Sequence, residues 1–184
     1  ALSGYYIMVC DIDLSEYLGI NGDGYDNGRG WRPIGTYFDV TDGTATDWAF
    51  NGTFDGNGHV ISGFFMDRSD DYAYNAGLFG YITAQGRVKN LGLRNAEGRS
   101  NKVRSYSGGF VGVNVGEISD CWADVDVITG EIFNVVGGFV GRNEGVITNC
   151  YSLGKVSGGS DVGCFAGVSH TDISSGTAVN CYAV

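Results

Sequence analysis

Residues 137–158 read GGFVGRNEGVITNCYSLGKVSG, and this stretch decides the fold because the chain returns to the same phrase. A glycine stands before a short apolar segment once in every 28 to 31 residues, at Gly58, Gly86, Gly116, Gly145 and Gly176. A second phrase of the form GFVG keeps the same pace upstream, ending at Gly80, Gly112, Gly141 and Gly167. Two phrases that share one period indicate an internal structural repeat.

Each repeat unit has the pattern of short strands. Its apolar residues alternate over a few positions between Gly, Asn and Ser, which is typical of strands and not of the 3.6-residue spacing of a helix. A unit of this length cannot bury a core alone, so neighbouring units must stack. We therefore predict an all-β fold, a β-solenoid (parallel β-helix) of about six coils with an N-terminal lead-in segment. Equivalent strands would stack in parallel at roughly 4.8 Å, leaving no room for a helix longer than two turns.

Equivalent residues of successive coils then form columns. An apolar column predicts part of the core: Leu78, Phe110, Phe139 and Phe165. The next column contains the thiols: Gly63, Leu91, Cys121, Cys150 and Cys181. An aromatic column follows: Phe64, Gly92, Trp122, Tyr151 and Tyr182. A column of side-chain amides marks a bend, where such groups satisfy the backbone or each other: Asn90, Asp120, Asn149 and Asn180.

The stretch at 137–158 resembles the GLUG repeat of bacterial surface proteins. Upstream, DIDLSEY, WRPIG and FNGTFDGNGHVISGFF resemble the lead-in segment that precedes such repeats. The resemblance covers nearly the whole chain and implies one β-solenoid domain over 1–184, with lead-in coils in 1–75 and GLUG-type repeats in 76–184. In that family such segments belong to adhesins and to non-catalytic parts of secreted peptidases. Cys164, Cys10 and the insertion SHTDISS depart from the repeat pattern.

The charge of the chain limits its partners. The formal net charge is −10 and the isoelectric point is about 4.4, which argues against nucleic acid and anionic membrane surfaces because phosphate would be repelled. No apolar run approaches the length of a membrane span, so we expect no membrane insertion. We expect an extracellular or cell-surface location, with further copies of the chain, flanking repeats of a longer chain, or surface glycans as partners.

The residues that could carry catalysis are few. His59 and His170 have no companion nucleophile motif, and the carboxylate pairs Asp11 with Asp13 and Asp124 with Asp126 would need a groove between facing acids to cleave a glycoside. We therefore expect no enzyme but a structural or adhesive module. The alternative is a β-helix that binds or cleaves a polysaccharide.

A metal site is conceivable in one loop. The stretch NGDGYDNGRG, residues 21–30, offers the oxygen ligands Asn21, Asp23, Asp26 and Asn27 for calcium, but it lacks the terminal bidentate Glu of an EF-hand. A plain glycine-rich turn is the competing interpretation. We expect no other cofactor.

The best candidate for a ligand surface is the ladder of Trp122, Tyr151 and Tyr182. If the neighbouring cysteines point inward, strand alternation turns these rings outward, where they would stack on sugar rings or on one another.

The last repeat still reads as a repeat at NCYAV. An uncovered coil is an edge hazard, so we expect it to meet either the first coil of another copy, which would build a filament, or the next coil of a longer chain. Cys10 would lie near one end of the solenoid and Cys164 and Cys181 near the other, which makes an intersubunit disulfide geometrically conceivable.

Overall fold

A computed structural model describes residues 2–35, 48–67, 75–95, 101–102, 106–129, 135–158, 160–169 and 176–184. These residues form short strands joined by turns, with one 3-10 helix, η1 (Asp26–Gly28). The described ranges contain no α-helix, as the repeat length predicts.

The strands follow the repeat. The lead-in makes two passes, β1 (Tyr5–Ile7) with β2 (Ile12–Asp13), then β3 (Thr53–Asp55) with β4 (Val60–Phe64). The next coil has β5 (Phe79–Ile82), β6 (Arg87–Lys89), β7 (Gly92–Asn95) and β8 (Asn101–Lys102). The following coil has β9 (Tyr106–Gly108), β10 (Val111–Asn114), β11 (Glu117–Ser119), β12 (Trp122–Asp124) and β13 (Val127–Ile128). Another has β14 (Val135–Gly137), β15 (Val140–Asn143), β16 (Val146–Thr148), β17 (Tyr151–Leu153) and β18 (Val156–Ser157). The last has β19 (Asp161–Gly163), β20 (Ala166–Val168), β21 (Thr177–Val179) and β22 (Tyr182–Ala183).

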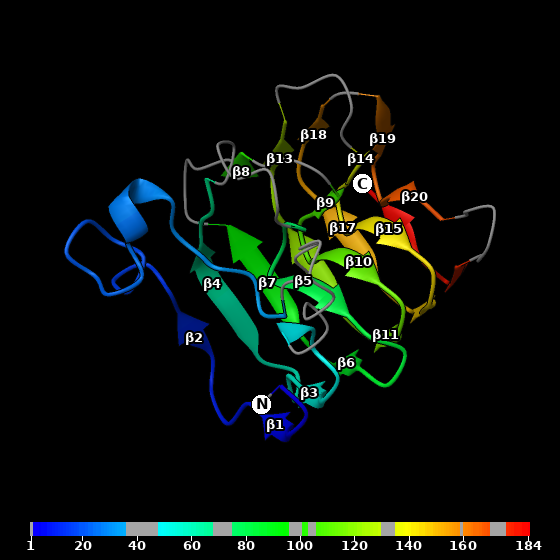
Figure 1. Ribbon diagram of the computed structural model, residues 1–184, viewed down its shortest axis with the longest axis horizontal. Coiled ribbons are helices and arrows are strands. Elements are labelled where there is room, and N and C mark those ends of the chain that lie inside the picture. The colour runs from blue at the N-terminus through cyan, green and yellow to red at the C-terminus, as the bar shows by residue number, and fades with distance from the viewer. Residues whose placement is uncertain are drawn as a thin grey trace, which may run out of the picture.

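Equivalent strands of successive coils pair in parallel and in register. Two sheets are six-stranded, in the orders β1-β3-β6-β11-β16-β21 and β2-β4-β7-β12-β17-β22. A four-stranded sheet β20-β15-β10-β5 and two three-stranded sheets, β18-β13-β8 and β19-β14-β9, form the other faces. Figure 1 shows the arrows stacked in chain order from blue to red, with η1 and the loop that leads to it from β2 lying to one side. The predicted β-solenoid is confirmed.

The chain runs through the two six-stranded sheets six times, but it completes fewer full turns of the solenoid than that. Two sheets contain the six strands that six coils predict, and both sheets run through the lead-in and the repeats alike. The first two passes, however, contribute strands to these two sheets only, within the described residues. The regular winding from β5 to β22 makes about three turns.

The predicted register of the lead-in is wrong at Gly58. Thr53 pairs with Arg87, and the Arg87 N–H donates to the Gly52 carbonyl at 2.9 Å, so Gly52 is the equivalent of Gly86. Val60 pairs with Gly92, which removes Gly63 and Phe64 from the thiol and aromatic columns. The shift arises because the β3–β4 turn is longer than the β6–β7 turn and contains Asn57 and Gly58 with φ of 53° and 79°.

The core is a column of phenylalanine rings. Phe110 and Phe139 are fully buried and stack at 4.7 Å between ring centroids, and Phe139 stacks on Phe165 at 5.0 Å with the planes 3° apart. Leu78, in register below them, is also fully buried, whereas Phe165 in the last coil is only partly buried. The predicted core column is therefore confirmed.

The glycines of the repeat mark close backbone approaches. A Cβ at Gly141, the end of a GFVG phrase, would lie 2.5 Å from the Ser107 nitrogen of a neighbouring strand. A Cβ at Gly145 would lie 2.1 Å from the Gly116 carbonyl oxygen of the coil below. Both positions exclude any side chain, which explains why the two phrases keep one period.

Candidate functional site

The predicted aromatic ladder lies on the outer face of the second six-stranded sheet. Trp122 and Tyr151 stack at 6.1 Å with their planes 8° apart, and Tyr151 and Tyr182 stack at 5.3 Å and 10°. Trp122 also packs over Gly92, where a Cβ would lie 2.4 Å from an indole carbon. The Arg94 guanidinium lies 5.5 Å from the Trp122 ring centroid.

This geometry favours self-stacking. The rings cover one another's faces along the solenoid axis, and a sugar would need an open face. The ladder therefore stabilises the stack of coils. A ligand role for Trp122, Tyr151 and Tyr182 stays a prediction.

The amide column at the bend forms a hydrogen-bonded ladder. Asn90, Asp120, Asn149 and Asn180 all have φ of 54° or 55°, a left-handed conformation that Asn and Asp tolerate better than most residues. Asn180 Nδ2 donates to Asn149 Oδ1 at 3.2 Å, and Asn149 Nδ2 donates to Asp120 Oδ1 at 3.0 Å. The ladder fixes the corner between the two six-stranded sheets.

A second, buried amide pair was not predicted from the sequence. Asn114 and Asn143 are 0% exposed, and Asn114 Nδ2 donates to Asn143 Oδ1 at 2.9 Å. Each Oδ1 accepts the backbone N–H of the glycine two residues later, Gly116 or Gly145. The signal was an Asn two residues before the register glycine in two successive repeats, in NVG at 114–116 and NEG at 143–145.

The cysteine column is buried only in part. Cys121 and Cys150 are 1% and 0% exposed, and the Cys121 N–H donates to Cys150 Sγ at 3.4 Å. Burial raises the pKa of the Cys121 thiol well above its ordinary value. Cys181, in the same column, is half-buried because it lies in the last described coil.

All five thiols are free in this structure. Cys10 lies in the exposed turn between β1 and β2, and Cys164 is exposed as well. A disulfide between subunits through Cys10, Cys164 or Cys181 stays a prediction.

The paired carboxylates hold local structure. Asp11 Oδ1 accepts the Val60 N–H at 3.0 Å and lies 3.0 Å from His59 Nδ1. Both bonds lower the pKa of Asp11, and the bond from the Val60 backbone contributes more than the bond with His59. Asp13 accepts the Ser15 N–H at 2.9 Å.

On the repeats, Asp124 lies 3.7 Å from Arg94, and Asp126 accepts the Lys155 N–H at 2.7 Å. His170 lies outside the described residues.

The Asp55 carboxylate is held by three neighbouring groups. It accepts Asn90 Nδ2 at 3.0 Å and the Asn57 N–H at 2.9 Å, and Lys89 Nζ lies 3.1 Å away. The Asn90 bond contributes most, then the Asn57 bond, and together with Lys89 they lower the pKa of Asp55 to about 2.

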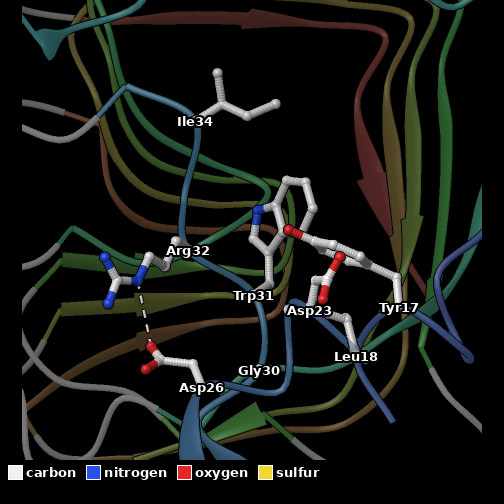
Figure 2. A pocket seen from close by; sticks show the side chains of 9 residues that line it. Tyr17, Leu18, Asp23, Asp26, Gly30, Trp31, Arg32 and Ile34 are labelled. Carbon is white, nitrogen blue, oxygen red and sulfur yellow. Dashed lines mark hydrogen bonds and ion pairs between the residues drawn. The ribbon is translucent and has the colours of Figure 1, made fainter. Parts of the chain in front are cut away.

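The lead-in loop contains a hollow of about 320 Å³, shown in Figure 2. Trp31 stands at its centre, with Tyr17 and Asp23 on one side and the Asp26–Arg32 ion pair on the other. The Trp31 indole N–H donates to the Leu78 carbonyl at 3.1 Å, which anchors the loop to the solenoid.

The calcium candidates lie around this hollow. Asp23 and Asp26 line it, and Asn21 lines a wider hollow beside it. The Asp26 carboxylate is bonded by Arg29 at 3.0 Å and by Arg32 at 3.2 Å, which compete with a metal ion. Over the described ranges, no three His, Cys, Asp or Glu side chains gather where they could hold a metal ion. Calcium binding stays a prediction.

Comparison with known proteins identifies the repeat. The family model of the GLUG motif matches residues 134–157. Halomucin of Haloquadratum walsbyi is 36% identical over 118 residues, which are 64% of this chain and 1% of halomucin. A putative Gly-rich membrane protein of Evansella cellulosilytica is 34% identical over 123 residues, 66% of this chain and 12% of that protein. No solved structure gives a significant match.

The chain therefore spans a small share of the relatives that it resembles. The described part of the chain has no helix long and apolar enough to cross a membrane. The motif match lies on β14 to β18, one full coil of the solenoid. The predicted resemblance is thus confirmed, and the chain is a β-solenoid that carries the GLUG motif.

Proposed function

We propose that this chain is an extracellular or cell-surface structural module without catalytic activity, whose coils stack on further coils. The observation that carries the proposal is that two six-stranded parallel sheets run through all the coils, so that each outermost strand offers an edge on which one more coil can pair. The names of the two relatives, a halomucin and a Gly-rich membrane protein, support a surface location.

The outermost strands support stacking. At β1, Tyr5 and Ile7 are 64% and 53% exposed, and at β21 and β22, Val179 and Tyr182 are 45% and 55% exposed. Apolar side chains on a strand with an unpaired edge favour pairing with another strand. The next coil belongs either to another copy, which would build a filament, or to flanking repeats of a longer chain.

The carboxylates support a non-catalytic role. Asp11, Asp13, Asp124 and Asp126 each bond to a neighbouring backbone N–H or cation, which stabilises turns and sheet faces. A second function, glycan binding, is favoured by the lead-in hollow and is developed below.

A pair of matched variants tests stacking between copies. Val179 on β21 and Val146 on β16 are 45% and 44% exposed and lie in the same sheet, but only Val179 is on its last strand. If copies stack, the purified chain forms fibres visible by electron microscopy, Val179→Lys abolishes them through charge at the edge, and Val146→Lys does not. An unmodified chain that stays monomeric by light scattering contradicts stacking between copies.

The same material tests the disulfide. Fibres joined through Cys10 give a ladder of oligomers on a non-reducing denaturing gel, and Cys10→Ser removes that ladder. Fibres without a ladder would contradict the disulfide alone.

A further inference from the structure

We propose that the lead-in hollow of Figure 2 binds one neutral pyranose unit of a glycan. The proposal does not depend on how the coils stack, because the hollow is built from residues 17–34 of a single chain. Its volume of about 320 Å³ lies at the lower end of the range for small-molecule sites, roughly 300–1,000 Å³.

The hollow has an aromatic wall in a fixed orientation. The bond from the Trp31 indole N–H to Leu78 O holds the ring, and Trp31 also packs against Phe64 at 6.3 Å between centroids. Tyr17, 47% exposed, lies beside Trp31 in Figure 2, on the same side of it as Asp23. The Tyr17 ring is in no stacked pair with another ring of the described residues, so the C–H face of a sugar can lie against it, with Trp31 as the wall of the hollow beside it.

The polar groups of the hollow suit hydroxyl groups. The Tyr17 hydroxyl and the Asp23 carboxylate make no hydrogen bond with any residue that the structure describes, so both can bond to a ligand. On the other side, Arg32 pairs with Asp26 at 3.2 Å and its side chain is 70% exposed, which leaves guanidinium donors facing solvent. The site thus offers both acceptors and donors, as sugar hydroxyls require.

The charge of the hollow selects a neutral sugar. Asp26 pairs with both Arg29 and Arg32, and Asp23 adds a second negative charge, so the four charged side chains at the hollow balance. Together with the chain's net charge of −10, this disfavours uronates and sulfated sugars.

The surroundings of the hollow suit a glycan longer than one sugar. A more open hollow of about 660 Å³ shares Tyr17 and Asp23, so a glycan can continue past Tyr17.

The test is a titration of the full chain with the methyl glycosides of glucose, galactose, mannose and N-acetylglucosamine, and with glucuronate. The chain has three Trp residues, so their indole N–H signals can be resolved and followed in a ¹H–¹⁵N spectrum. We expect at least one neutral glycoside to shift the Trp31 signal selectively, and glucuronate to bind about tenfold more weakly or not at all.

Variants at exposed positions locate the site without disturbing the core. Tyr17→Ala should weaken binding about tenfold and Asp23→Asn several-fold. Asp161→Asn, an exposed acid on β19, and Tyr182→Ala, on the outer ladder, should leave the affinity unchanged.

Three results would overturn the proposal: no glycoside shifts Trp31 at any soluble concentration, the shift falls on Trp122, or Tyr182→Ala weakens binding while Tyr17→Ala does not. Tighter binding of glucuronate than of the neutral glycosides would also refute the assigned chemistry.

Discussion

The buried amide pair makes a quantitative prediction for Asn143→Asp. The change keeps the shape of the side chain, and its Oδ1 still accepts from Asn114 Nδ2 and the Gly145 N–H. The atom that replaces Nδ2 now faces the Thr177 carbonyl, to which Nδ2 donates at 3.3 Å. A carboxylate at this fully buried position with an acceptor against it should lower the free energy of unfolding by about 3–5 kcal/mol near neutral pH.

The sign of the pH dependence follows from burial. Burial raises the pKa of the introduced carboxyl above its value of about 3.9 in the unfolded chain. The penalty is therefore small below about pH 4, where the protonated group donates to Thr177 O. It grows as the pH rises and levels off above the raised pKa.

Urea unfolding followed by circular dichroism measures this penalty against the unmodified chain at about pH 7 and about pH 4. Asn51→Asp, an exposed position, controls for the added charge and should stay within about 0.5 kcal/mol of the unmodified chain. The reasoning is refuted if Asn143→Asp unfolds like Asn51→Asp at neutral pH, or if its penalty does not shrink in acid.

Three further predictions concern the core, the thiols and Asp55. Phe139→Ala removes a ring stacked on both sides and should lower the free energy of unfolding by about 3–5 kcal/mol; a loss below about 1 kcal/mol in urea unfolding would contradict the ring column. A thiol reagent should label Cys10 and Cys164 rapidly in the folded chain, whereas rapid labelling of Cys150 would contradict its burial. Cys150→Ser should destabilise by roughly 1–3 kcal/mol in the same unfolding assay. Because its folded pKa is about 2, Asp55 contributes about 2 kcal/mol above pH 4, which is lost as the pH falls through about 2. The unfolding free energies of the unmodified chain and Asp55→Asn should therefore converge in strong acid, and a constant difference would disprove this role.

The regular part of the fold could be predicted because its period is marked by glycines at positions where no other residue fits. Gly141 and Gly145 leave no space for a side chain, so two phrases had to recur together. The columns that contain Phe139, Tyr151 and Asn149 follow from that period alone. In these coils, the number of residues between a side chain and the preceding register glycine correctly predicts the column in which the side chain lies.

The lead-in could not be aligned by the same rule. Asn57 and Gly58 lengthen the turn after β3, and a glycine in that turn mimicked the register glycine, which is Gly52. The hollow around Trp31 was missed for a related reason. It depends on a bond to Leu78, 47 residues away, that no local pattern records.

The burial of side chains in the last coil could not be predicted from the repeat pattern either. Cys181 reads like Cys150 in sequence, but a column position does not say whether another coil covers it. The structure leaves Cys181 half-buried.

The central claim is that successive coils pair in parallel in one fixed register, and hydrogen-bond scalar couplings between ¹⁵N and ¹³C′ nuclei measure this directly. The structure requires couplings from the Tyr151 nitrogen to the Cys121 carbonyl, from the Tyr182 nitrogen to the Cys150 carbonyl, and from the Arg87 nitrogen to the Gly52 carbonyl. Observation of all three supports the stacked solenoid and its corrected lead-in register. Couplings from these nitrogens to carbonyls of their own coil, or from Arg87 to the Gly58 carbonyl, would contradict it.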